Sequence, residues 1–237
     1  MKVSGGKQIY GAPIGILMLE AQFPRIPGDV GNAQTWPFPV LYRVVTDASP
    51  DLVVRRGAEG MLEPFIAAGR DLIALGAEAI TTNCGFLSPF QSALAEALGV
   101  PVATSALMQV PMAQAMLPSG RRVGVITISA ESLSPAHLEA AGCPADLPVV
   151  GTEGGAEFSR AILGNELELD VEAARRDLCD AARRLVAAHD DLGAIVLECT
   201  NMPPYQADIQ ALTGLPVFSM VDYVCWIYRG LRPERWS

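Results

Sequence analysis

The sequence predicts an α/β protein built from two duplicated lobes, each with a mostly parallel sheet, related by a pseudo-twofold axis. Three observations predict this class: an internal repeat spans most of the chain, short apolar runs alternate with segments of helical periodicity, and half of the residues are apolar while only 6% are aromatic. Such a composition suits helices packed on a sheet. We expect a first lobe over residues 1–107, a second lobe over residues 108–218, and a C-terminal segment, 219–237, that packs back on the first lobe.

The repeat is clearest around two cysteines. When the chain is shifted by 115 positions, which is 199 minus 84, AITTNCGFLSPFQSALAEALGVPVATS lies without a gap on AIVLECTNMPPYQADIQALTGLPVFSM. This shift brings Cys84 onto Cys199 and Gln91 onto Gln206. Looser similarity continues upstream, so each half is expected to follow the order β-β-α-β-α-β or a close variant.

The elements of the first half follow from its apolar runs and from the glycines and prolines between them. A helix is expected over 62–76, where apolar residues recur at helical spacing. Pro89 suits the first turn of a further helix, because a missing N–H costs nothing there, and Gly99 suits its C-terminus. Strands are expected over four runs: 13–20, 39–47, 77–82 and 99–105.

The second half repeats the pattern. A helix is expected over 172–189, with His189 capping its end, and a further one after Pro204. Residues 221–237 are expected to form a helix across the junction of the lobes. Strands are expected over 122–129, 147–153, 193–198 and 214–220.

Both cysteines therefore lie where a strand gives way to a helix. Parallel α/β units bind ligands at the carboxyl ends of their strands, and a pseudo-twofold axis makes Cys84 and Cys199 face each other across the cleft between the lobes. The alternative is that both are buried strand-end cysteines inherited from one ancestral half. Their neighbours are polar or lack a side chain, which is unsuited to pure core: Asn83, Gly85, Thr200 and Asn201.

A pair of facing thiols suits proton transfer at carbon. The free N–H groups of a helix N-terminus are expected to lower the pKa of each cysteine towards neutral. Together with Asn83, Thr200 and Asn201, they would hold a carboxylate between the two sulfurs. One thiolate then removes a proton from the adjacent carbon while the opposing thiol delivers one to the other face. Racemisation follows from that arrangement.

Composition excludes several other classes of protein. The formal charge is −9, with 17 Lys and Arg against 26 Asp and Glu, so nucleic acid is not expected as a partner. Lys2 and Lys7 are the only lysines, which argues against a pyridoxal phosphate enzyme. His137 and His189 are the only histidines and no cluster has metal-ligand spacing, so we expect neither a metal nor a cofactor.

The chain is also expected to act away from membranes. Its longest apolar run near the start is IGILML, much shorter than the roughly 20 residues of a membrane span, and the first residues lack the pattern of a signal peptide. Five cysteines without CxxC spacing fit reduced thiols in the cytoplasm. Cys143, Cys179 and Cys225 have no counterpart in the repeat and are interpreted as packing residues.

The segment from Glu20 to Pro39 is rich in proline and follows the first strand at its carboxyl end, so it is expected to cover the cleft. Glu20, at the strand end itself, is the best candidate there for orienting substrate. For Arg25 and Asp29 the alternative, that they are solvated loop charges, is at least as strong. In the second half Ser132 is expected to cap a helix, and roles for Thr127 and Ser129 stay open.

The paired motifs TTNCGF and LECTNMPPY, the duplication and the absence of a cofactor lysine resemble the aspartate/glutamate racemase superfamily, which also holds hydantoin racemases, maleate isomerases and arylmalonate decarboxylases. The resemblance is strongest over 77–105 and 192–220. It implies two α/β lobes, no cofactor, Cys84 and Cys199 as the proton-transfer pair, and a substrate carboxylate bound by the neighbours of the two cysteines: Asn83, Gly85, Thr200 and Asn201.

Two departures bear on the reaction. Glutamate racemases have an Asp-Ser pair after the first strand, where this chain has MLEAQF, and a His at the position of Asn201. The stretch from PGD to YRVV instead resembles the branch that contains algal dimethylsulfoniopropionate lyases, in which deprotonation by a cysteine leads to β-elimination.

The hypotheses are therefore ordered. The first is a cofactor-independent racemase or epimerase that acts on a small carboxylate such as an amino acid. The second is a lyase, isomerase or decarboxylase of the same superfamily, and the third is a binding protein without catalysis, since two α/β lobes around a cleft also describe solute binders. The family likeness favours a homo-oligomer, with Tyr223, Trp226 and Tyr228 as candidates for its interface.

Overall fold

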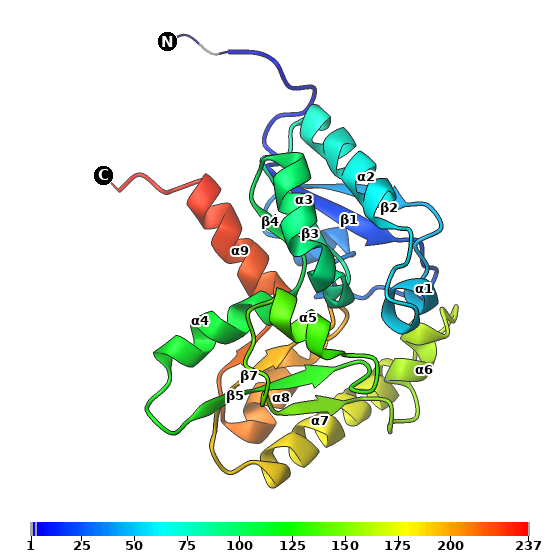
Figure 1. Cartoon of the computed structure of the whole chain (residues 1–237), viewed down its shortest axis with the longest axis vertical. Coiled ribbons are helices and arrows are strands. Elements are labelled where there is room, and N and C mark those ends of the chain that lie inside the picture. The colour runs from blue at the N-terminus through cyan, green and yellow to red at the C-terminus, as the bar shows by residue number, and fades with distance from the viewer. Residues whose placement is uncertain (1, 3, 237) are drawn as a thin grey trace.

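The structure is a computed structural model that describes residue 2 and residues 4–236. It contains two four-stranded sheets, one in each half of the chain, and every strand pairs in parallel with its neighbours (Figure 1). The first sheet has the order β2-β1-β3-β4 and the second the order β6-β5-β7-β8, so the two halves share one topology. The α/β class with two duplicated parallel sheets is confirmed.

The first sheet consists of β1 (Ile14–Leu19), β2 (Val40–Val45), β3 (Ala79–Thr82) and β4 (Val102–Ala103). The second consists of β5 (Arg122–Thr127), β6 (Val149–Gly151), β7 (Leu192–Leu197) and β8 (Val217–Phe218). Every residue of β1 and β3 is buried, as continuous apolar runs in a parallel sheet require. All eight expected strands are present; β7 has the length expected and starts one residue earlier, and the other seven are shorter than their expected runs.

The helices are α1 (Pro50–Arg55), α2 (Leu62–Leu75), α3 (Gln91–Leu98), α4 (Gln109–Met116), α5 (Pro135–Ala140), α6 (Phe158–Leu163), α7 (Val171–Ala188), α8 (Gln206–Thr213) and α9 (Met220–Leu231). The sequence predicted α2 and α7 to within two residues at each end, and His189 is the C-cap of α7. It missed α1, α4, α5 and α6, because three of them have only six residues, too few for periodicity to show.

The two prolines that were expected to begin helices stand instead in 3₁₀ turns. Pro89 lies inside the turn Gly85–Phe90 and Pro204 inside the turn Pro203–Tyr205, and α3 and α8 start directly after them. Ser132 is not a helix cap, contrary to the prediction: Ser134 caps α5 in a capping box with His137. Ser132 instead donates its backbone N–H to the Ser129 hydroxyl, 3.2 Å away.

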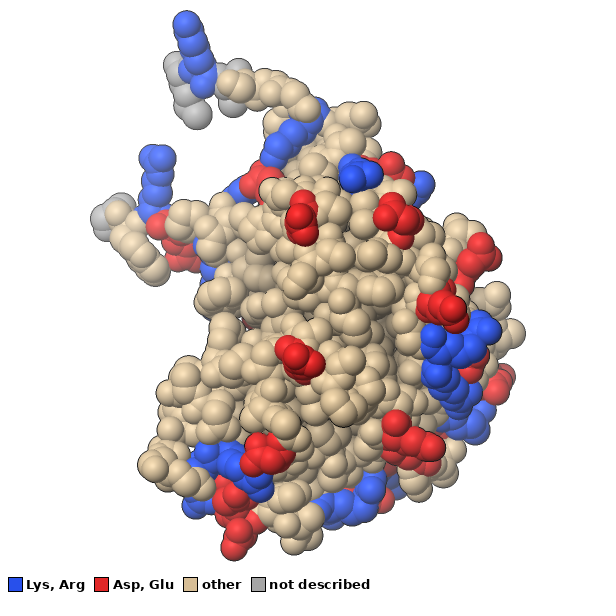
Figure 2. Space-filling view, viewed as in Figure 1, with Lys and Arg blue, Asp and Glu red and all other residues tan. Residues whose placement is uncertain are grey.

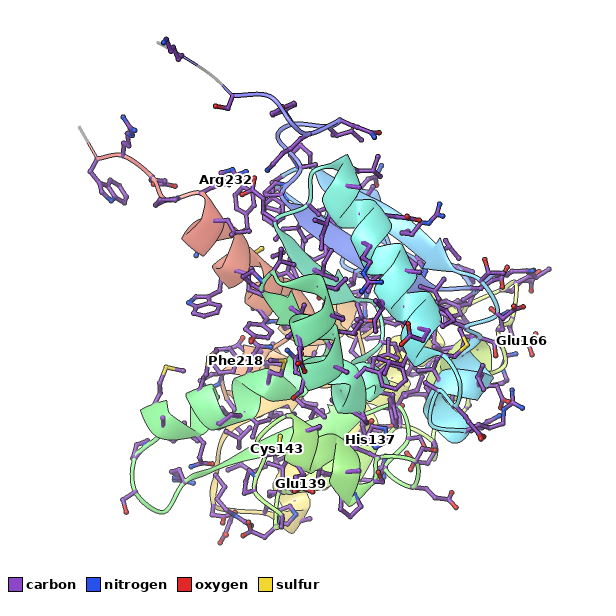
Figure 3. The ribbon with its side chains drawn as sticks, turned by 45° about the horizontal axis from the view of Figure 1, so that its top comes forward. His137, Glu139, Cys143, Glu166, Phe218 and Arg232 are labelled. Carbon is purple, nitrogen blue, oxygen red and sulfur yellow. The ribbon has the colours of Figure 1, made fainter. Side chains whose placement is uncertain are left out.

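The C-terminal helix α9 ends beside the first lobe (Figure 1). The rings of Tyr228 and Phe38 stack with centroids 3.7 Å apart. Arg232, labelled in Figure 3, forms an ion pair with Glu78 at 2.8 Å. Hydrogen bonds from Arg232 and Lys7 lower the pKa of Glu78 to about 2. These contacts tie the end of the chain to the lobe in which it begins.

On the face shown in Figure 2, acidic and basic side chains lie mainly around the edge and the middle is largely uncharged. None of the helices in the described part of the chain has the length and apolarity to cross a bilayer.

Candidate active site

Cys84 and Cys199 line one small cavity at the carboxyl ends of β3 and β7. The cavity holds about 20 Å³, room for about one water molecule. Both thiols are buried, with 8% of each residue exposed. The pseudo-symmetric placement expected from the repeat brings the cysteines of the two lobes to a shared space. Other lining residues come from both lobes: Phe23, Pro50, Val54, Asn83, Gly85, Phe86, Ile128, Ile162, Leu163, Glu198 and Asn201.

The first lobe presents an amide to this cavity. The Oδ1 atom of Asn83 accepts the Leu19 N–H at 2.7 Å, which fixes the side chain against the end of β1. Its Nδ2 atom is buried and has no hydrogen-bond partner among the described residues. An unpaired buried amide costs free energy unless a ligand or water satisfies it. The free Nδ2 is thus available as a donor to a bound carboxylate.

The second lobe holds its cysteine more tightly. The Cys199 thiol donates to Oδ1 of Asn201 at 3.4 Å. Asn201 in turn donates through Nδ2 to Asp29 at 2.5 Å, and Asp29 accepts from Arg25 at 3.0 Å. Because Asp29 is only 2% exposed, it is not a solvated loop charge. The proline-rich loop that carries Arg25 and Asp29 therefore fixes Asn201 and, through it, the thiol proton of Cys199.

Thr200 joins the two cysteine loops. Its hydroxyl donates to the backbone carbonyl of Asn83, and its own carbonyl accepts the Val30 N–H at 3.2 Å. Since the hydroxyl and the carbonyl of Thr200 are both occupied by partners in the first lobe, its contribution to the site is to hold the lobes in register. It does not line the cavity with the other site candidates.

Glu198 is a site residue that the sequence interpretation left without a role. It is fully buried, its Oε2 atom accepts the Thr127 hydroxyl at 2.8 Å, and its Oε1 atom has no partner among the described residues. Burial raises the pKa of this carboxyl to about 7, although the hydrogen bonds from Thr127 and the Ile128 N–H act in the opposite direction. The repeat contained the signal, because the shift that superposes the cysteines places Glu198 on Asn83.

Gly85 leaves the space that Glu198 occupies. A Cβ atom at this position would lie 2.2 Å from Oε1 of Glu198 and 2.7 Å from its backbone oxygen. Real Cβ contacts are not that short, so a side chain here would displace the carboxylate or the strand end that bears it. The role of Gly85 is therefore close approach between the two lobes.

The sequence of this chain matches a known protein family over most of its length. A family model described as Asp/Glu/Hydantoin racemase matches residues 55–227. The chain belongs to the Asp/Glu/hydantoin racemase family. The family resemblance inferred from the two motifs is confirmed.

Curated relatives of this family member are lyases. The chain is 29% identical over 231 residues to a dimethylsulfoniopropionate lyase of Durusdinium sp. clade D, which covers 92% of this chain and 75% of that protein. It is 30% identical over 223 residues to dimethylsulfoniopropionate lyase 6 of Emiliania huxleyi (strain CCMP1516), covering 88% of this chain and 57% of that protein. The chain thus spans little more than half the length of that algal relative.

Solved structures share the fold of this racemase-family chain. An arylmalonate decarboxylase superposes with a TM-score of 0.59 at 18% identity and covers 94% of both chains. An aspartate racemase homologue from Pyrococcus horikoshii superposes with a TM-score of 0.57 at 15% identity and covers 93% of this chain and 99% of its own. At these identities the likeness concerns the fold.

The two cysteine thiols are less acidic than the sequence predicts. Burial, and next the Glu198 carboxylate, raise the pKa of Cys84 to about 12, and the same two causes raise the pKa of Cys199 well above its usual range. The prediction that the pKa of each cysteine is lowered towards neutral was therefore wrong for this cavity. The backbone N–H groups of Phe86 and Asn201 do favour the thiolates, but desolvation in so small a space outweighs them.

Glu20 is not brought to the cavity. Its side chain is exposed, and its Oε2 atom accepts the Asp47 N–H at 2.8 Å, which holds the turn after β2. Thr127, whose role the sequence left open, binds Glu198, whereas the Ser129 hydroxyl donates to Ser132 at 3.0 Å.

The cavity is closed by a roof of apolar side chains from α1, α6 and the proline-rich loop: Phe23, Pro50, Val54, Ile162 and Leu163. Directly outside lies a hollow of about 790 Å³, which shares Val54 and Leu163 with the inner cavity. The outer hollow is polar and includes His137, labelled on α5 in Figure 3. Because the inner cavity has room for about one water, we expect that a larger molecule reaches it only when α1 and α6 separate.

Replacing Leu163 by Ala is expected to open the roof. Leu163 is 7% exposed, so the change should cost about 2 kcal/mol of folding free energy while making labelling of Cys84 and Cys199 by a small thiol reagent about tenfold faster. Labelling rates by mass spectrometry, with unfolding curves in urea, measure both effects. Leu147→Ala is the control, because Leu147 is 8% exposed and lines neither space. Equal rates in the two variants would contradict this entry route.

Proposed function

We propose that this chain is a cofactor-independent enzyme that removes a proton from carbon next to a carboxylate, with Cys84 and Cys199 as its acid/base pair. The observation that carries the proposal is the shared cavity: two thiols from equivalent strand ends of the two lobes border one space with room for about one water molecule. Two buried amide side chains support it. Asn83 offers a free donor for the substrate carboxylate, and Asn201 orients the proton of Cys199.

The structure offers less for the other proposed binding residues. Gly85 permits close packing and Thr200 holds the loops together, so both act on the site through its shape. Glu20 has no such support, since it holds a turn outside the cavity.

The outcome that we favour is β-elimination from a carboxylate that carries a sulfonium group on its β-carbon. The relatives named above are dimethylsulfoniopropionate lyases. None of the described residues lining the cavity is Lys or Arg, whereas Glu198 places a carboxylate there. A cationic sulfonium is favoured beside Glu198 and the ring of Phe86, whereas the Phe23 ring already has the Arg25 guanidinium 4.4 Å from its centroid. A second substrate carboxylate would be repelled, which disfavours maleate isomerisation and malonate decarboxylation.

In this reaction one thiolate takes the proton on the α-carbon. The electron pair of the broken C–H bond forms the C=C bond as the β-carbon–sulfur bond breaks, and that pair leaves with a neutral sulfide. The products are an unsaturated carboxylate, a sulfide and one proton. The leaving group needs no proton, so a single base suffices.

Racemisation of an amino acid is the second candidate, and the presence of two thiols, one from each lobe, in the cavity lining favours it. An amino acid also carries a cation beside its carboxylate. The distinction is that racemisation uses both cysteines in every turnover, whereas elimination needs only one.

The test of the proposed function is a panel of a sulfonium acid and amino acids incubated with the protein in deuterated water. Elimination gives sulfide and an unsaturated acid, and racemisation gives deuterium at the α-carbon with loss of optical purity. A protein that binds members of the panel and catalyses neither change would instead be a binding protein, the third hypothesis.

Two further proposals concern the whole molecule. We expect the enzyme to work in the cytoplasm, where its five free cysteines stay reduced.

We also expect it to form a homo-oligomer through α4 and α9, which expose an apolar patch: Met112, Met116 and Trp226 are 41%, 68% and 60% exposed. Exposed apolar patches mark interaction sites.

Replacing Trp226 by Glu is expected to dissociate the oligomer, because a charge in the centre of an apolar interface is left without a partner. Light scattering at several protein concentrations measures the mass. Trp236→Glu is the matched control, since Trp236 is 89% exposed and lies beyond α9. If both variants keep the mass of the unmodified protein, the interface lies elsewhere or the protein is a monomer.

A further inference from the structure

Glu198 is a buried ionisable group. A mechanism that uses only the two thiols for proton transfer does not need it. It contributes no cap to a helix, it forms no ion pair in the described part of the chain, and it is fully buried. Burying a carboxylate without a cationic partner costs free energy, so stability does not account for a glutamate at this position. Its position, on the cavity wall directly before Cys199, indicates that the reason is chemical.

The surroundings of Glu198 leave one oxygen free. Oε2 is held by the Thr127 hydroxyl, whereas Oε1 has no partner and lies against Gly85, the residue after Cys84. The groups that face Glu198 from the elements around it are Thr127 and the Ile128 N–H on the β5 side and the two thiols. Asp29 and Arg25 lie farther out and pair with each other.

The two thiols are not equivalent. Cys199 donates its proton to Asn201, which holds it in the thiol form. Among the described residues the Cys84 thiol donates no hydrogen bond, and the Phe86 N–H favours its thiolate, so no acceptor other than Glu198 competes for its proton. The free oxygen of Glu198 is therefore placed to serve Cys84.

We propose that Glu198 accepts the proton of Cys84, so that Cys84 becomes the base that attacks substrate, and later carries one proton per turnover out of the closed cavity. This proposal rests on the proposed function and assigns its base. In the first step the Cys84 S–H bond breaks and an O–H bond forms on Glu198. The single negative charge moves from carboxylate to sulfur.

The remaining steps balance this transfer. The Cys84 thiolate takes the α-proton of the substrate, which restores the thiol, and the sulfide leaves with the electron pair of its carbon bond. Glu198 is then still protonated. When the roof opens, it loses its proton to water, and the proton released matches the one removed from substrate. The pKa of about 7 suits a group that releases its proton to water near neutral pH. Because the pKa of Cys84 is about 12, the transfer from thiol to carboxylate is uphill, and the thiolate is a transient species that the α-proton of the substrate quenches.

Glu198→Gln separates this role from a structural one, because Gln keeps the Thr127 hydrogen bond and removes the charge. The loss of a like charge should lower the pKa of Cys84 by about 1–3 units, so Cys84 should react at least tenfold faster with methyl methanethiosulfonate at pH 8. Turnover should nevertheless fall about 100-fold, and the limb of the kcat profile near pH 7 should disappear. Glu157→Gln, at a 9% exposed glutamate outside the cavity, should change neither quantity.

Infrared difference spectroscopy supplies a reading that needs neither reagent nor substrate. The carboxylic C=O band should titrate near pH 7 in the unmodified protein and be absent from Glu198→Gln. Thr127→Val, which removes a hydrogen bond to the carboxylate, should move that titration to higher pH. If the band does not titrate near neutral pH, or if Glu198→Gln leaves both Cys84 reactivity and turnover unchanged, Glu198 is not the proton acceptor.

These readings separate the two proposals. A shifted Cys84 reactivity with no turnover of any carbon acid would overturn the proposed function and leave the coupling of Glu198 to Cys84 standing. Turnover that is unchanged in Glu198→Gln would overturn the role of Glu198 and leave the two-cysteine enzyme standing.

Discussion

Cys84→Ser should abolish catalysis, with turnover reduced at least 100-fold, because a serine hydroxyl keeps the size of the thiol but hardly ionises. Cys199→Ser should have a smaller effect on elimination, since its thiol only assists. Racemisation would instead be lost equally in both variants. Rates of sulfide release and of α-deuteration therefore distinguish the reactions with the same two proteins.

Cys143→Ser is the matched control for these cysteines. The Cys143 thiol donates to the Leu107 carbonyl at 3.5 Å, and burial raises its pKa to about 11. It lies outside the cavity, so its replacement should leave the rate unchanged. If Cys84→Ser and Cys143→Ser retained equal activity, the thiol mechanism would be wrong.

Gly85→Ala is the second change with a large expected effect. The added Cβ would meet Oε1 of Glu198 at 2.2 Å and its backbone oxygen at 2.7 Å, so rotation of the side chain alone cannot relieve the contact. We expect a loss of about 1–3 kcal/mol of folding free energy from overpacking and a fall in activity of at least 100-fold as the carboxylate and Cys84 move apart.

Urea unfolding and turnover measure the two effects of Gly85→Ala. Gly154→Ala is the control, because a Cβ at Gly154 meets nothing within 4 Å. Unfolding curves that coincide for the two variants would show that the lobes do not approach as closely as the structure has them.

Much of the fold and the cysteine pair could be predicted from the sequence because the sequence contains an internal repeat. Apolar runs and helical spacing gave the eight strands and the long helices α2 and α7, because these elements are set by burial on a sheet. The superposition of Cys84 on Cys199 gave the pair that lines the cavity. Short-range pattern and internal symmetry carry this information, and both are visible in one sequence.

The features that could not be predicted from the sequence depend on long-range contacts and on desolvation. Asp29 lies in a loop far along the chain from Asn201, yet the two side chains are hydrogen-bonded in the interior. Glu198 was passed over because a glutamate after an apolar strand resembles any surface charge until its burial is known. The acidity of the thiols was predicted in the wrong direction for the same reason, since a helix N-terminus is local and the size of a cavity is not.

The exchange of Asn83 for Glu198 between otherwise equivalent positions has a stereochemical consequence. Two lobes with identical cysteine loops would enclose a space with twofold symmetry, in which a substrate could lie in either of two opposite orientations. An amide at one end and an acid at the other remove that degeneracy, so a zwitterion has one preferred direction. In the proposed reaction the two hydrogens on a prochiral α-carbon would then not be interchangeable, and Cys84 would remove only the one directed at it. In the proposed reaction, this difference between the duplicated halves would therefore set which hydrogen is removed.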